Sequence, residues 1–193
     1  MSVSTTQIII EHLIAGIQAA IWLTLIVFAM FGYDWISVNN LMDIPGEILA
    51  LLIIVLYPIG IFIDEMADKI LLNWSEKIRK RTISERSIAV SDQDKIKVSY
   101  LFSQNLDERL KDYFSYVRTR IRIARSTALN FLLITLSLEV FLITRLHVDT
   151  YTIIIVTIIG VTLTILAMLS WYFFTTAFIN KTIDQLRLKS LIS

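Results

Sequence analysis

The chain has 193 residues, of which 55% are hydrophobic, and its mean hydropathy is +0.67. Such a composition excludes an ordinary soluble domain and indicates an integral membrane protein. The formal net charge of +1 points to no particular class of partner. Because cysteine is absent, a disulfide framework, a thiolate zinc site and a cysteine nucleophile are all excluded.

Four apolar runs are each long enough to cross a bilayer as a helix. They cover residues 8–31, 44–63, 126–144 and 151–179. None alternates as a membrane β-strand does, so we expect an all-α integral membrane protein with four transmembrane helices. The first run is long and no Lys or Arg precedes it, which predicts a permanent anchor rather than a cleaved signal peptide.

The charges are distributed unevenly along the chain. Residues 31–47 include three acidic residues and no Lys or Arg, whereas residues 64–125 include fourteen of the 18 basic residues. By the positive-inside rule, the basic segment and both termini are expected to be cytoplasmic. The expected location is the plasma membrane of a bacterium or an archaeon.

The second apolar run contains Pro58 and Gly60. A proline inside a helix removes one backbone hydrogen bond, so this pair is a candidate hinge, and a static kink is the alternative. Beyond the run the apolar spacing stays helical, and two acids within 92–94 indicate the start of a further helix. The expected units are spans one and two in 1–66, a cytoplasmic helical hairpin in 67–125, spans three and four in 126–180, and a cytoplasmic tail in 181–193.

Residues 105–144 form the most extended predicted helix. Its first part carries a stripe of basic side chains, and its second part, 126–144, has Glu139 as its only charge. About 19 residues of α-helix extend roughly 28 Å, enough to cross a hydrocarbon core. This helix is therefore expected to carry the basic stripe up to the lipid boundary and to continue through the membrane unbroken.

Acidic residues at the end of the second run lie at the depth of this basic stripe. The two sets are Asp64, Glu65, Asp68, Arg118, Arg122 and Arg125. In one interpretation these opposite charges pair at the membrane boundary and fix the register of two helices. In the other, the arginines hold a phosphate, from a lipid head group or from a cytosolic nucleotide.

Glu139 lies inside the third span, where an ionised carboxylate is costly, so it should face a partner or water. Thr157 lies at a similar depth in the fourth span, and Thr157 and Thr164 belong to a stripe of small residues along that helix. Such a stripe allows close packing of helices. The alternative is the polar wall of a pore, in which Glu139 forms a charged ring in an oligomer.

The chain has no sequence motif of a hydrolase, an ATPase, a metalloprotease or a dinucleotide-binding enzyme, so we expect neither enzymatic activity nor a cofactor. His12 and His147 are predicted on opposite sides of the membrane, which excludes a metal ion shared between them. The basic segment lacks aromatic residues at stacking intervals, so nucleic acid is not an expected partner.

The outline of four spans, two cytoplasmic termini and a large middle loop resembles the connexin and innexin large-pore channels in topology, although those families carry cysteines in both outer loops. It also resembles small membrane effectors of bacterial antiviral systems, which assemble and breach the inner membrane when a cytosolic partner signals.

The unbroken helix, the Pro58 kink, Glu139 and the small-residue stripe favour an oligomeric membrane channel or pore-type effector, gated through the hairpin by a cytosolic protein or nucleotide. The alternative is a non-conducting membrane anchor or accessory subunit that presents the basic hairpin to a soluble partner or to anionic lipid. A membrane enzyme or transporter is the least favoured hypothesis, because catalytic motifs and inverted repeats are missing.

Overall fold

The computed structural model describes residues 5–33, 46–86 and 108–188, which are helical apart from short connections and include no strand. The helices are α1 (Thr5–Phe31), α3 (Gly46–Glu85), α5 (Glu108–Phe141) and α6 (Thr150–Leu188), and a π-helical turn, η2 (Leu142–Leu146), extends α5. The all-α prediction is confirmed.

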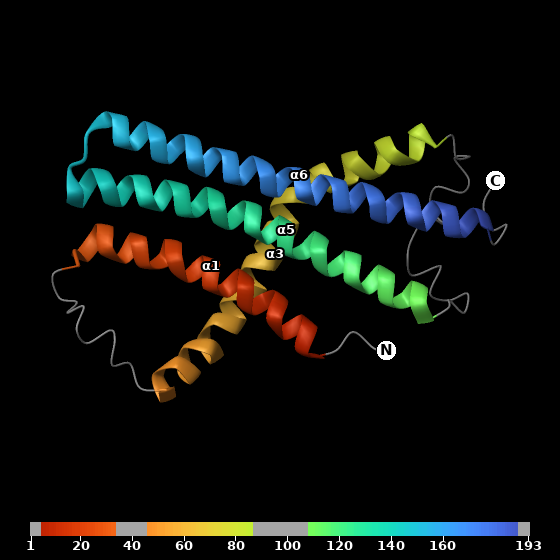
Figure 1. Ribbon diagram of the computed structural model, residues 1–193, viewed down its shortest axis with the longest axis horizontal. Coiled ribbons are helices and arrows are strands. Elements are labelled where there is room, and N and C mark those ends of the chain that lie inside the picture. The colour runs from red at the N-terminus through yellow and green to blue at the C-terminus, as the bar shows by residue number, and fades with distance from the viewer. Residues whose placement is uncertain (1–4, 34–45, 87–107, 189–193) are drawn as a thin grey trace.

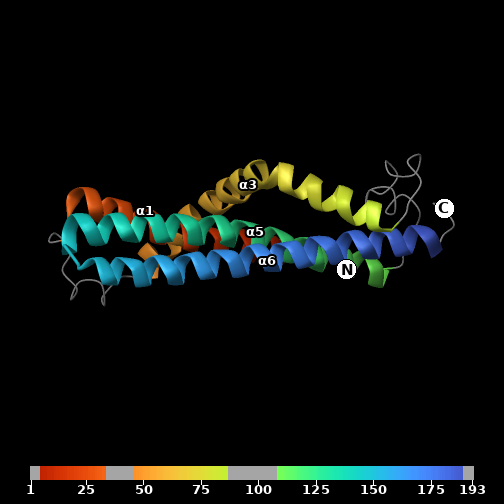
Figure 2. The same cartoon turned by 90° about the horizontal axis from the view of Figure 1, so that it is seen from above.

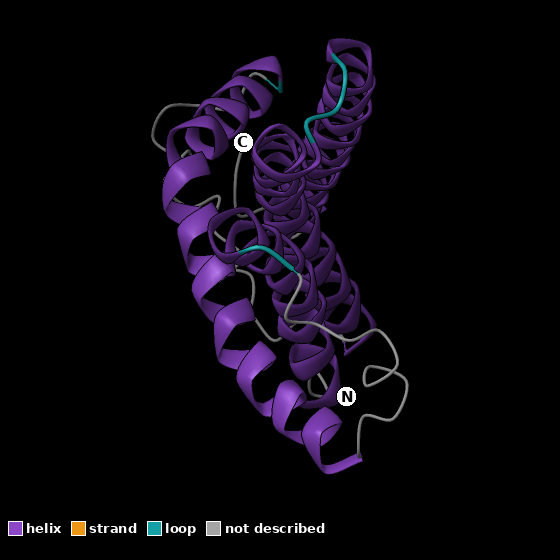
Figure 3. Cartoon of the chain, turned by 90° about the vertical axis from the view of Figure 1, so that its left-hand side faces the viewer, coloured by secondary structure: helices purple, strands orange, loops and turns teal. Residues whose placement is uncertain are grey.

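Three of the helices lie side by side and the fourth crosses them (Figure 1). Helices α1, α5 and α6 run along the long axis of the molecule, whereas α3 runs obliquely past them. Seen from one end of the molecule, α3 extends across the view (Figure 3). From above, α3 bends in its middle and stands away from α5 and α6 there (Figure 2). We call the end where α5 begins and α6 ends the basic end.

Three described helical segments are long and apolar enough to cross a membrane: Ile9–Phe31, Glu108–Leu146 and Thr150–Leu188. They contain three of the four predicted spans, and many of their Ile and Leu side chains are exposed, as lipid-facing side chains are. The structure therefore supports a membrane protein with transmembrane helices.

The second predicted span is helical, but it is not among these three. Helix α3 begins at Gly46, so it covers the predicted run 44–63 from its third residue onward. The four-span arrangement thus stays a prediction. The turn of the predicted hairpin and the start of its second arm lie outside the described residues.

Helices α1 and α3 touch backbone to backbone at Gly16 and Gly60. A Cβ atom added to Gly60 would lie 1.7 Å from the carbonyl oxygen of His12, and one added to Gly16 would lie 2.0 Å from the carbonyl oxygen of Leu56. Only glycine permits so close an approach of two helices. Helix α3 continues without a break through Pro58, so Gly60 is a point of contact and a hinge motion there stays a prediction.

Helices α5 and α6 form a closely packed pair joined by a short connection. Gly160 of α6 packs on the side chain of Thr135, where an added Cβ would lie 2.0 Å from the hydroxyl oxygen. Asp149 caps α6, because its carboxylate accepts hydrogen bonds from the backbone and hydroxyl of Thr152. These two bonds hold the pKa of Asp149 below its ordinary value.

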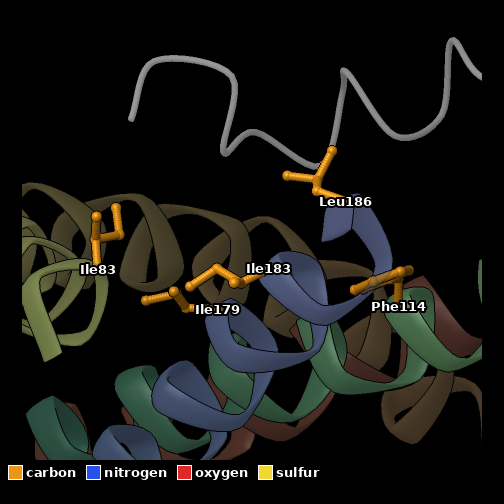
Figure 4. Close-up of a cluster of buried hydrophobic side chains, with 5 residues drawn as sticks. All are labelled: Ile83, Phe114, Ile179, Ile183 and Leu186. Carbon is orange, nitrogen blue, oxygen red and sulfur yellow. The ribbon is translucent and has the colours of Figure 1, made fainter. Parts of the chain in front are cut away.

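At the basic end, α3, α5 and α6 meet in a small apolar core (Figure 4). Its buried side chains are Ile83, Phe114, Ile179, Ile183 and Leu186. The ring of Phe114 packs edge-on against Phe178, with centroids 5.5 Å apart. The last turns of α3 are therefore fixed to α5 and α6 by hydrophobic burial, beyond the bend in α3.

We predict that Gly60→Ala weakens the packing of α1 against α3 by about 1–3 kcal/mol, because the added methyl group meets backbone atoms that a side-chain rotation cannot move. Thermal unfolding of the detergent-solubilised protein measures the change. Val55→Ile adds one carbon on an exposed face of the same helix and should have little effect. Equal stabilities of the two variants would contradict the close contact.

Candidate functional site: a charged network joining three helices

Asp64 of α3 lies between two arginines of α5. Its carboxylate accepts hydrogen bonds from Nε of Arg122 at 3.0 Å and from Nη2 of Arg125 at 2.9 Å. Asp68, one turn further along α3, pairs with Nη1 of Arg125. The structure thus brings together four of the six residues that the sequence places at the membrane boundary.

The other two residues, Glu65 and Arg118, do not join these pairs. They line a neighbouring cleft of about 490 Å³, whose wall also includes Arg79, Arg122 and Arg125. Glu65 is exposed because it lies about 100° around α3 from Asp64. Arg118 is exposed one turn nearer the basic end than Arg122, and it forms no ion pair with any residue that the structure describes.

Helix α1 adds a third side to the cluster through Glu11, which sequence analysis did not include. Glu11 is 5% exposed, accepts a hydrogen bond from the hydroxyl of Thr119, and lies 3.9 Å from Nη1 of Arg122. We refer to Glu11, Asp64, Asp68, Arg122 and Arg125 as the charged network. The position of Glu11 near the basic end of the first span was the signal that could have identified it.

Burial divides the charged network into an inner and an outer part. The side chains of Glu11 and Asp64 are 5% and 7% exposed, whereas that of Asp68 is 56% exposed. Buried carboxylates need nearby cations to offset the loss of hydration, and here two carboxylates share Arg122. The inner part of the network can therefore hold α3 in place only while both arginines stay in contact with it.

A second polar contact joins α1 to α5 two turns further into the membrane-spanning region. Asn130 is fully buried, donates to the carbonyl of Ala15 at 3.2 Å and to Gln18, and accepts from the indole of Trp22 at 3.1 Å. Thr127 also donates to Gln18, at 3.2 Å. Such hydrogen bonds fix the register of helices that otherwise meet through apolar side chains.

Glu139 lies near the opposite end of α5 and is half-buried. The hydroxyl of Thr157 lies 2.7 Å from the Glu139 carboxylate and 2.9 Å from the carbonyl of Ile153 in its own helix, so it can donate to either. The hydroxyl of Thr164, two turns further along α6, bonds to the carbonyl of Gly160 in its own helix. In the small-residue stripe of α6, Gly160 and Ala167 are buried, as small residues at a close contact between helices are.

We predict that Asp64→Asn destabilises the packing of α3 by about 3–5 kcal/mol, because two arginine side chains lose the carboxylate that pairs with them. Glu65→Gln, one residue away and outside the charged network, is the matched control and should have little effect. Chemical unfolding in detergent micelles measures both variants. A similar loss from both would show that the network contributes nothing specific.

Comparison of the chain with protein-family models, with curated proteins and with solved structures found no match. Among the described residues there is also no group of three or more side chains that could hold a metal ion. The polar contacts described above are the charged network, near the middle of α3 and α5, and the contact of Glu139 with Thr157 near the end of α5.

Proposed function

We propose that this protein is an oligomeric helical membrane channel of the effector type, gated by movement of α3 relative to α5 at a cytoplasmic basic end. The observation that carries the proposal is the way α3 is attached. In its middle it is held by charged side chains, Asp64 and Asp68 on Arg122 and Arg125, beside clefts that separate it from α5 and α6.

An attachment of this kind suits a switch. Charge pairs at a partly exposed boundary can exchange one partner for another, whereas a filled apolar interface resists separation. Asp68 and Arg122 are both open to water in part, so a phosphate or an acidic partner entering from the basic end could compete for the arginines. Release of Arg122 or Arg125 would free the middle of α3.

Helix α5 provides a direct connection from the charged network to the far end of the membrane. It is a single helix from Glu108 to Phe141, without proline or glycine. Fourteen residues separate Arg125 from Glu139, which is about 21 Å of helix. A tilt of α5 at the charged network would therefore displace Glu139 and its bond with Thr157.

An oligomer is proposed because of the apolar surface that the described helices expose. The spans expose many large apolar side chains, which can pack against lipid or against further copies. In an assembly, the half-buried Glu139 would provide the ring of carboxylates that selects cations. The remaining elements of this proposal are four spans, with α3 as one of them, and both termini in the cytoplasm.

A second candidate function, a non-conducting membrane anchor or accessory subunit, is favoured by a different observation. The exposed hydroxyls of Thr162 and Ser170 on α6 bond to carbonyls of their own helix, at 2.7 and 2.9 Å. Both hydroxyl groups are therefore paired within the helix, so they leave no unpaired polar group facing lipid and few groups that water could bind. In this case the basic end would bind a soluble partner and no ions would pass.

Ion leakage from liposomes that contain the purified protein separates the two functions. A channel should give leakage that favours cations, and Glu139→Gln should reduce that preference while the oligomer, weighed in detergent, stays intact. Gln retains the acceptor for the Thr157 hydroxyl, so the variant removes the charge with little change in packing. Thr162→Val, on an exposed face of α6, is the control.

Two outcomes would contradict the channel. One is cation leakage that Glu139→Gln leaves unchanged, which would remove the role of Glu139. The other is an absence of leakage in both the unmodified protein and Asp64→Asn, in which the attachment of α3 is weakened and opening should become easier. The second result would favour the anchor.

A further inference from the structure

Beneath the bend of α3 lies a cleft of about 1020 Å³, which we call the apolar cleft. Its walls come from the middle of α3, the part of α5 beyond Arg125, and the central turns of α6. Nearly all the lining side chains are hydrophobic, and they include Ile70, Trp74, Leu132 and Leu169. These four side chains line the cleft and remain 44–56% exposed.

The cleft is too large and too apolar to be left to water. Pockets for small ligands commonly measure about 300–1,000 Å³, and an apolar wall in contact with water loses the free energy that burial would provide. The wall residues on α5 and α6 belong to the segments that can cross a membrane, so the cleft opens where lipid chains are available. A flexible hydrocarbon chain is the occupant that both facts favour.

The lining also carries the groups that recognise a lipid head. Lys77 is its one charged side chain, and it forms no ion pair with any residue that the structure describes. Trp74 and Tyr172 lie beside the cleft, and such rings prefer the level of the head groups. Trp171 lies in the wall of both the apolar cleft and the neighbouring cleft of about 490 Å³. The neighbouring cleft also holds the exposed Arg118, which adds positive charge.

We propose that the apolar cleft binds one anionic phospholipid, with an acyl chain between α3 and the α5–α6 pair and the phosphate at Lys77. Bound in this way, the lipid fills the space under the bend of α3 and completes the packing that the chain leaves open. It is a structural ligand, distinct from the trigger that the proposed function requires, and its binding does not depend on whether the protein conducts ions.

Native mass spectrometry of the full-length protein, released from nanodiscs with equal amounts of phosphatidylglycerol and phosphatidylcholine, tests the proposal. We expect retained phospholipid enriched in phosphatidylglycerol. Lys77→Gln should lower this enrichment about fivefold, the effect of one basic residue near an anionic lipid surface. Lys80→Gln, on the same helix but outside the cleft wall, should leave the enrichment unchanged.

Leu132→Trp tests the chain-binding part separately, because a larger ring fills the cleft. It should abolish retention of both lipids, whereas Leu136→Trp, one turn away and outside the wall, should not. Circular dichroism and gel filtration show whether Leu132→Trp folds. If it does not, the result for Lys77→Gln alone decides whether the proposal holds. The proposal would be overturned if lipid retention were the same in Lys77→Gln and Leu132→Trp as in the unmodified protein. It would also be overturned if the protein were a lipid-free dimer that Leu132→Trp dissociates, because a second copy of the chain would then fill the cleft.

Discussion

The pairing of Asp64 with Arg122 and Arg125 is the interaction on which the arrangement of this protein depends. It joins the middle of α3 to α5, between the glycine crossing with α1 and the small core at the end of α3. The pairing fixes where α3 crosses α5, and that crossing in turn leaves the two clefts on either side of Trp171. The ion pairs of Asp64 thus determine where the clefts beside α3 lie.

Much of this arrangement follows from features visible in the chain itself. Runs of apolar residues identify the helices, and the depth of the acids and arginines predicts that Asp64 and Asp68 meet Arg122 and Arg125. The role of Glu11 was missed, because its partner depends on which helix lies beside α1, and apolar periodicity does not specify neighbours. The oblique course of α3 was missed for a related reason, since a crossing angle arises from contacts such as Gly16 on Gly60.

The same limit explains the outcome for Glu139, Thr157 and Thr164. Two side chains at equal depth lie at the same level of the membrane, but depth alone does not say whether they face one another. Glu139 and Thr157 satisfy both conditions. Thr164 lines the apolar cleft, and its hydroxyl bonds to the carbonyl of Gly160 in its own helix.

The contacts between α1 and α5 have a consequence for how the protein is made. Glu11 and Thr119 are 108 residues apart, and Asn130 is 115 residues from Ala15. At about 5–20 residues per second, a ribosome needs roughly 5–20 s to synthesise that interval. During this time α1 must remain near its site of insertion with Glu11 and Gln18 bound only to water, lipid or the insertion machinery. Helix α1 can thus pack on α3 through Gly16 and Gly60 well before the polar partners of Glu11 and Gln18 on α5 have been synthesised.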